Sequence, residues 1–164
     1  IEEQALQAGV GFWPGTSLPT GGPSTHCVLT AHNGLVRAKM FTDLDQLVEG
    51  DTFSLSILDR VLTYEVDQIL VTEPDEVDAL QIVEGQDYVT LYTCTPYGVN
   101  THRLLVRGHR IETPENVNLG NGAVDIIRTQ SGMTVLITLA VVGLLILLFR
   151  IWRIFRARKK KQQT

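Results

Sequence analysis

Two strand-like runs joined by a turn decide the fold class: Tyr88-Val89-Thr90-Leu91-Tyr92-Thr93-Cys94, the connection Thr95-Pro96-Tyr97-Gly98-Val99-Asn100-Thr101, and His102-Arg103-Leu104-Leu105-Val106-Arg107. Both runs are rich in β-branched, aromatic and aliphatic residues, and the connection contains Pro96 and Gly98, which favour turns. The pattern predicts a β-hairpin. A register in which paired residue numbers sum to 197 places Cys94 opposite Arg103 on one face of it.

The stretch upstream of this hairpin predicts more strands and one short helix. Alternating apolar residues over 53–57 and 62–71, separated by an Asp59-Arg60 turn, indicate a second hairpin. Before it, Thr42 followed by Asp45 resembles a capping box, and leucines at helical spacing then predict a short surface helix ending at Gly50. We therefore expect a mainly β domain with short helices, folded as a closed or nearly closed barrel.

The C-terminal part predicts a single membrane span. Residues 132–149 carry no charge over 18 residues, enough to cross about 30 Å of hydrocarbon, and they lack the polar face of a buried core helix. Seven of the fourteen Lys and Arg follow within 150–164, which places this tail in the cytoplasm and the N-terminal domain outside the cell membrane. The polar segment 112–131 is interpreted as a juxtamembrane linker.

Charge limits the partners of the N-terminal domain. All eighteen acidic residues precede residue 132, together with only seven basic ones, and this strongly acidic balance argues against nucleic acid as a partner. The acids are scattered and show no ligand spacing, so neither a metal nor a cofactor is expected. The chain begins at Ile1 without a signal peptide, so we expect it to be a processed or truncated piece of an exported protein.

Three residues near predicted strand ends are candidates for chemistry: His32, Cys94 and Arg103. A thiolate is a nucleophile, and an imidazolium beside it favours that form and can later protonate a leaving amine. A guanidinium can bind a substrate carbonyl or the oxyanion of a tetrahedral intermediate. Together the three side chains describe acyl transfer through a thioester.

The second cysteine leaves alternatives open. Cys27 and His32 are five residues apart on one predicted strand and should face opposite sides, which disfavours a local pair and makes Cys94 the better nucleophile. A Cys27-Cys94 disulfide in a non-catalytic, membrane-tethered binding domain is the main rival. Spacing alone also fits a buried structural cysteine and a surface histidine.

The stretch Tyr88 to Arg110 closely resembles the active-site hairpin of class C sortases, the pilin-polymerising transpeptidases of Gram-positive cell surfaces. The resemblance spans roughly residues 3 to 111 and includes further segments: Gly15-Thr16-Ser17-Leu18-Pro19, Ser24-Thr25-His26, Ala31-His32-Asn33-Gly34-Leu35, Ala38-Lys39-Met40-Phe41-Thr42-Asp43-Leu44 and Tyr64-Glu65-Val66-Asp67-Gln68-Ile69. It implies a sortase-type closed β-barrel over residues 1–111, followed by a C-terminal transmembrane helix.

The resemblance also implies roles. Cys94 is the nucleophile, His32 the general acid/base, and Arg103 the arginine that holds the substrate; Arg107, on the same predicted face, is a fallback for substrate binding. The implied reaction cleaves the Thr-Gly bond of an LPXTG-like sorting signal and transfers the acyl group to a lysine amine of a pilin subunit. A sortase of another class, which anchors proteins to peptidoglycan, would keep the same three residues.

Two departures from the family pattern stand out. The family often has arginine after the histidine, where this chain has Asn33. The family's N-terminal lid with an Asp-Pro-aromatic motif is absent from the sequence. Either the lid and first strands precede Ile1 in the full protein, or this is an incomplete copy whose barrel does not close.

Overall fold

The computed structural model describes residues 6–7, 9–33, 39–114 and 124–127 of the 164-residue chain, with 124–127 as backbone only. Its elements are, in chain order, β1 (Gly11–Phe12), β2 (Thr25–Thr30), η1 (Leu44–Gln46), β3 (Thr52–Ile57), β4 (Arg60–Thr72), η2 (Asp78–Leu80), β5 (Asp87–Thr95), β6 (His102–Ile111) and β7 (Val124–Ile127). The two η elements are single 3-10 turns. The expectation of a mainly β domain is confirmed.

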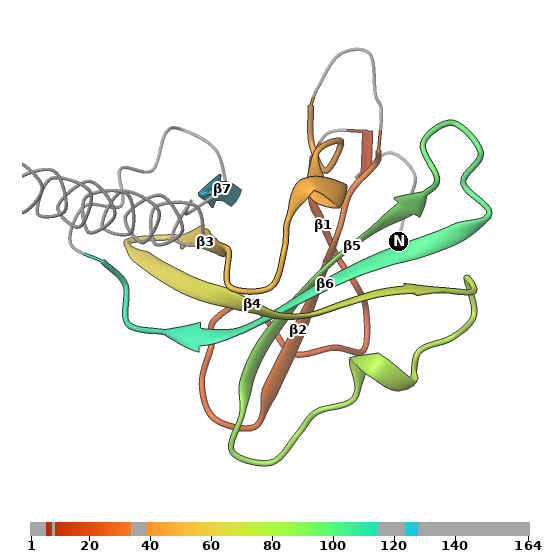
Figure 1. Ribbon diagram of the computed structural model, residues 1–164. Helices are drawn as coiled ribbons and strands as arrows, with labels where there is room; N and C mark the ends of the chain where they lie inside the picture. The colour runs from red at the N-terminus through yellow and green to blue at the C-terminus, as the bar shows by residue number, and fades with distance from the viewer. Residues whose placement is uncertain (1–5, 8, 34–38, 115–123, 128–164) are drawn as a thin grey trace, which may run out of the picture. The chain divides into compact units, whose positions relative to one another are not determined.

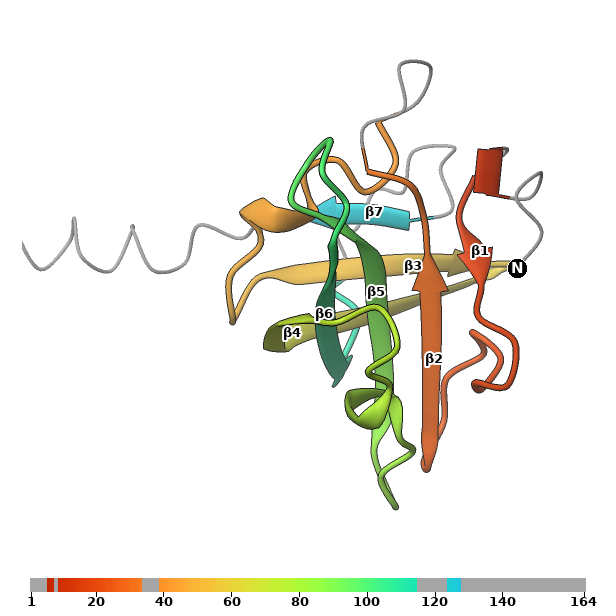
Figure 2. The same ribbon diagram turned by 90° about the vertical axis from the view of Figure 1, so that its right-hand side faces the viewer.

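One seven-stranded sheet holds the domain together, in the order β1-β2-β5-β6-β4-β3-β7 (Figure 1). All neighbours are antiparallel except β2 and β5, which pair in parallel across a long connection that contains β3 and β4. In Figure 2, β3 and β4 run across the direction of β2 and β5, so the sheet is strongly curled.

The sheet is curled rather than closed over the described residues. β1 and β7 form its two edges, and no ladder between described strands joins them. The closed barrel expected from the sequence is therefore not seen in this part of the chain. The strand β7, from the segment 112–131 that was interpreted as a linker, extends the sheet by pairing with β3.

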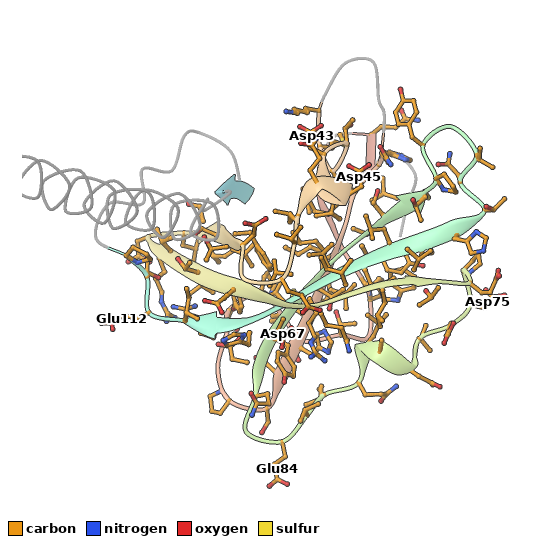
Figure 3. The ribbon with its side chains drawn as sticks, viewed as in Figure 1. Asp43, Asp45, Asp67, Asp75, Glu84 and Glu112 are labelled. Carbon is orange, nitrogen blue, oxygen red and sulfur yellow. The ribbon has the colours of Figure 1, made fainter. Side chains whose placement is uncertain are left out.

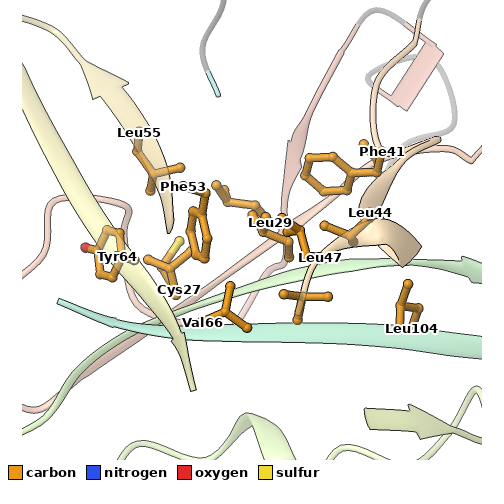
Figure 4. Close-up of a cluster of buried hydrophobic side chains, with 14 of the residues drawn as sticks. Cys27, Leu29, Phe41, Leu44, Leu47, Phe53, Leu55, Tyr64, Val66 and Leu104 are labelled. Atoms are coloured by element: carbon orange, nitrogen blue, oxygen red, sulfur yellow. The ribbon is translucent and has the colours of Figure 1, made fainter. Parts of the chain in front are cut away.

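The concave side of the sheet carries the larger core (Figure 4). Phe53, Leu55, Leu62, Tyr64 and Val66 are buried at alternate positions of β3 and β4, as the sequence predicted. The turn between these strands is Leu58-Asp59 rather than Asp59-Arg60, because Ile57 already pairs with Arg60. Leu58 takes the positive φ of 56° that such a tight connection needs.

The predicted short helix is a single turn that belongs to the core. The N-cap is Asp43 rather than Thr42, and its side chain makes no capping hydrogen bond, so the predicted capping box is wrong. Leu44 and Leu47 are 0% and 5% exposed. Burial of these two leucines, not local capping, fixes the turn, which is why it is not a surface helix.

A second, smaller cluster covers the other face of the sheet. Val28, Tyr92 and Leu105 pack there beneath Leu80 of η2, with Trp13 from the residues after β1 against them. This face carries the candidate catalytic residues. Among the described residues no helix is long and apolar enough to span a membrane, and the span expected at 132–149 lies outside them.

Candidate active site

The β5–β6 hairpin has the register that the sequence predicted. In every pair from Tyr88 with His109 to Thr95 with His102 the residue numbers sum to 197, and Cys94 is directly opposite Arg103. Directly opposed residues in an antiparallel pair place their side chains on the same face. The hairpin alone therefore brings the thiol and the guanidinium together, one residue pair before the turn that joins β5 to β6.

His32 reaches the same place through the parallel pairing of β2 with β5. The last strand pair is Thr30 with Tyr92, and the backbone N–H of Ala31 still donates to the Tyr92 carbonyl at 3.3 Å. His32 follows as the chain leaves the sheet, at the end of β5 where Cys94 lies. Parallel strands bring their carboxyl ends to one edge, which is how residues 62 apart become neighbours.

One pocket collects all three predicted residues. It has a volume of about 610 Å³ and is lined by Leu6, Trp13, Pro14, Thr30, Ala31, His32, Pro74, Asp75, Tyr92, Thr93, Cys94 and Arg103. Trp13 packs edge-on against Tyr92, with ring centroids 4.8 Å apart. Apolar walls with a few polar groups are typical of a site that binds a peptide or small ligand.

Arg103 is held at the pocket by the backbone of its own loop. One terminal nitrogen, Nη1, donates to the carbonyls of Asn100 at 3.1 Å and His102 at 2.9 Å. Its Nε and Nη2 atoms carry three further N–H groups, which are suited to carbonyl or oxyanion oxygens. Burial raises the pKa of Tyr92, while Arg103 beside it acts in the opposite direction, so this phenol is neutral.

Several residues of the site were not identified from the sequence. Trp13, Pro74 and Asp75 reach the pocket from connections whose placement depends on the whole sheet. The Asn33 side chain contacts the nucleophile's own peptide group, since Nδ2 donates to the Cys94 carbonyl at 3.1 Å. No local pattern marks these residues, because each contact joins segments far apart in sequence.

Cys27 lies on the opposite, core-facing side of β2 and is 2% exposed. Burial raises its pKa to about 12, and the nearby Asp87 carboxylate acts in the same direction, so the thiol stays protonated. Cys27 pairs with Val89, five residues before Cys94 on β5, a distance of about 16 Å along a strand. A disulfide needs Cα atoms within about 7 Å, and both cysteines are free, so the proposed disulfide is wrong.

Arg107 is committed to a different cluster and does not line the pocket. Its Nε and Nη2 donate to the two carboxylate oxygens of Asp67 at 2.9 and 3.1 Å, and its guanidinium stacks on Tyr88 at 4.3 Å. Asp67 is the extra residue of a β-bulge between β4 and β6. Figure 3 shows it over the middle of the sheet, whereas the pocket residue Asp75 lies beyond the end of β4.

The remaining histidines occupy structural or surface positions, as expected. His26 is 1% exposed: Nδ1 donates to the Gln81 carbonyl at 2.9 Å, and Nε2 lies 2.8 Å from the Thr90 hydroxyl. Burial lowers its pKa, which the Gln81 hydrogen bond partly opposes. His102 lies 3.3 Å from Glu73 and His109 lies 4.0 Å from Asp67, both with partly exposed side chains.

A thiol, an imidazole and a guanidinium around one pocket can carry out acyl transfer through a thioester. The thiol attacks, the imidazole moves the proton, and the guanidinium binds the oxygen on which charge develops. Within the described ranges, no three side chains of His, Cys, Asp or Glu gather as metal ligands would. The geometry matches the chemistry that residue types alone suggested.

Comparisons with known proteins match this chain to one family. A model of the sortase domain matches residues 1–111. Sortase C1 from Streptococcus agalactiae is 54% identical at a TM-score of 0.68, over 70% of this chain and 59% of that one. Sortase C1 from Streptococcus suis is 56% identical at a TM-score of 0.69, over 72% and 66%.

Sortase C from Streptococcus pneumoniae is 53% identical at a TM-score of 0.67, over 68% of this chain and 59% of that one, and its structure is described as giving insight into catalysis and pilin substrate specificity. The chain thus spans about three-fifths of the length of these solved structures. No curated protein sequence matches it.

Proposed function

This chain belongs to the sortase family and is similar to class C sortases, and on that premise we propose that it is a cysteine transpeptidase that joins pilin subunits. The observation that supports this most strongly is the pocket in which His32, Cys94 and Arg103 meet, although 71 residues separate the first from the last. Cys94 is partly exposed there, and the other thiol is buried in the core.

In the first half-reaction the Cys94 sulfur attacks the threonine carbonyl carbon of an LPXTG-like sorting signal. Arg103 donates to the carbonyl oxygen as this becomes an oxyanion. The hydrogen bonds of Nη1 to the loop backbone hold the guanidinium, so that the N–H groups on Nε and Nη2 stay in place. The carbon–nitrogen bond then breaks, and the leaving glycine amine takes a proton from the His32 imidazolium. The products are a thioester on Cys94 and a free glycine amine.

In the second half-reaction a lysine amine of the next pilin subunit attacks the thioester carbon. Its proton passes to His32, the carbon–sulfur bond breaks, and the thiolate of Cys94 is regenerated. One peptide bond is exchanged for one isopeptide bond, so no oxidant or cofactor is consumed. The structure of the pneumococcal relative is described as giving insight into pilin substrate specificity, which supports a pilin as the substrate.

The enzyme acts at the outer face of the cell membrane. The uncharged segment 132–149 is long enough to span the bilayer, and the basic residues after it favour a cytoplasmic C-terminus. If the segment is a true span, the full chain stays in the membrane pellet after extraction at pH 11. Release into the supernatant would contradict the single-pass topology.

Acceptor choice tests the pilin-polymerase assignment. The full chain is incubated with a sorting-signal protein and offered either a pilin subunit with surface lysines or an oligoglycine amine that imitates peptidoglycan. We expect covalent ladders with lysine isopeptide bonds. Conjugates with the oligoglycine alone would assign the protein to another sortase class, and neither product would reject transpeptidation.

A further inference from the structure

The hydrogen bonds that join β2 to β5 in parallel, here called the β2–β5 ladder, have the same residue separation at both ends of the ladder. The N–H of Thr25 donates to the carbonyl of Gln86 at 3.0 Å, and the N–H of Ala31 donates to the carbonyl of Tyr92 at 3.3 Å. In both cases the acceptor lies 61 residues after the donor. The next rung of the same ladder requires a donor at residue 33 for the carbonyl of Cys94.

Asn33 supplies that donor from its side chain. Its Nδ2 lies 3.1 Å from the Cys94 carbonyl oxygen, 61 residues away, although β2 itself ends at Thr30. The side chain of Asn33 thus adds one more hydrogen bond to the β2–β5 ladder after the backbone has left the sheet. A side-chain amide has the same N–H group as the backbone and can take its place.

The neighbouring contacts show what this substitution achieves. The Thr93 hydroxyl donates to the Ala31 carbonyl at 2.8 Å, so the segment is tied to β5 immediately before His32 as well as immediately after it. His32 lies between the two ties and lines the pocket with Cys94. The His32 carbonyl accepts a hydrogen bond from the Phe41 N–H at 3.3 Å, so the backbone has turned away from β5 at this residue.

The other end of the Asn33 amide makes no hydrogen bond within the part of the chain that the structure describes. Its Oδ1 is buried and has no hydrogen-bond partner among the described residues. A buried acceptor without a partner is unfavourable for folding, whereas an apolar side chain of the same shape carries no such cost. Among the described residues, the hydrogen bond to the Cys94 carbonyl is thus the contact that uses the amide of Asn33.

We propose that Asn33 is a positioning residue, whose amide continues the β2–β5 ladder onto the Cys94 carbonyl and so holds the nucleophile and the His32 turn in register. The inference concerns geometry at the site, and only its kinetic consequence rests on the proposed function. Asn33 does not touch the reacting atoms. It acts through the peptide group of Cys94 and the segment that carries His32.

The test replaces Asn33 in the full chain and measures both chemistry and thiol reactivity. Asn33→Leu keeps the approximate shape but has neither donor nor acceptor, and Asn33→Ala removes the side chain. The control Gln46→Glu lies on the exposed side of η1, away from the pocket. Each protein is assayed for cleavage of an LPXTG-type peptide and for alkylation by iodoacetamide across pH 5 to 9.

We expect both Asn33 variants to lose about tenfold or more in kcat with little change in KM, because small errors in placing a nucleophile are costly once substrate is bound. The pH profile of Cys94 alkylation should also change, because Cys94 and the segment that carries His32 no longer keep their relative positions. Arg103 and Asp75, the charged residues that share this pocket, are unchanged in both variants. The thermal midpoint should stay near that of the wild type.

Other outcomes would contradict either the positioning role of Asn33 or the proposed function, and the two cases can be told apart. Wild-type kcat and an unmoved alkylation profile in both variants would overturn the positioning role. A large fall in the thermal midpoint with an unmoved profile would also overturn it, since Asn33 would then be structural only. If the wild type itself cleaves no peptide, the proposed function fails, but the alkylation profile still decides the role of Asn33.

Discussion

Replacing Gly108 with alanine should destabilise the domain by overpacking its core. A Cβ added at this position of β6 lies 2.7 Å from Phe53 Cε1 and 2.9 Å from Tyr64 Cβ. Both aromatic residues are 0% exposed, and their rings stack at 5.6 Å, so neither can move aside without disturbing the other. Forcing extra volume into such a core typically costs about 1–3 kcal/mol.

For a domain of this size, each kcal/mol lowers the thermal midpoint by roughly 4–8 °C, so the variant should melt at least about 4 °C below the wild type. Circular dichroism of the full chain measures this. Gly9→Ala is the matched control, because an added Cβ there meets nothing within 4 Å. If Gly108→Ala has the same thermal midpoint as the wild type, the packing of Phe53 against β6 is not as described.

Three further predictions concern the site and its surroundings. Arg103→Lys should lower kcat/KM for peptide cleavage by about 10²-fold, because an ammonium cannot reproduce the anchored, forked donor; unchanged kcat/KM would exclude Arg103 from the reaction. Near pH 8, iodoacetamide should modify Cys94 but not Cys27, whose pKa burial raises to about 12, and peptide mapping that found Cys27 modified first would contradict its core position. The pKa of His26 is lowered from its ordinary value of 6.5 in the folded state, so the unfolded chain binds more protons; stability should be full above about pH 6.5 and decline as the pH falls below it. Thermal midpoints from pH 7.5 to 5 should therefore fall less in His26→Gln than in the wild type, and equal slopes would contradict the assignment.

Local sequence pattern was sufficient where a single turn determines which residues of two strands pair. The register of β5 with β6 follows from a single hairpin, so the pairing of Cys94 with Arg103 is a local property that alternation and turn residues encode. Strand parity likewise predicted that Cys27 and His32 face opposite sides: Cys27 lies in the core, and His32, two residues beyond the end of β2, lines the pocket. Both predictions depend only on residues within a strand or a few positions beyond its end.

Local sequence pattern was not sufficient where contacts between distant segments determine the structure. The residues around Leu44 have helical spacing, yet burial of Leu44 and Leu47 holds them in one 3-10 turn. The pairing of Val124–Ile127 with the edge of β3, within the segment 112–131, also had no signal in the polar composition of that segment. The rung from Asn33 to Cys94 depends on a parallel pairing across 61 residues, which no local signal reveals.

The most direct test of the central claim is the intact mass of the full chain after incubation with an LPXTG-type peptide and no amine acceptor, beside Cys94→Ala and Cys27→Ala. We expect an acyl adduct on the wild type and on Cys27→Ala, and none on Cys94→Ala. An adduct that persists in Cys94→Ala, or no adduct on any of the three proteins, would contradict thioester chemistry at this pocket.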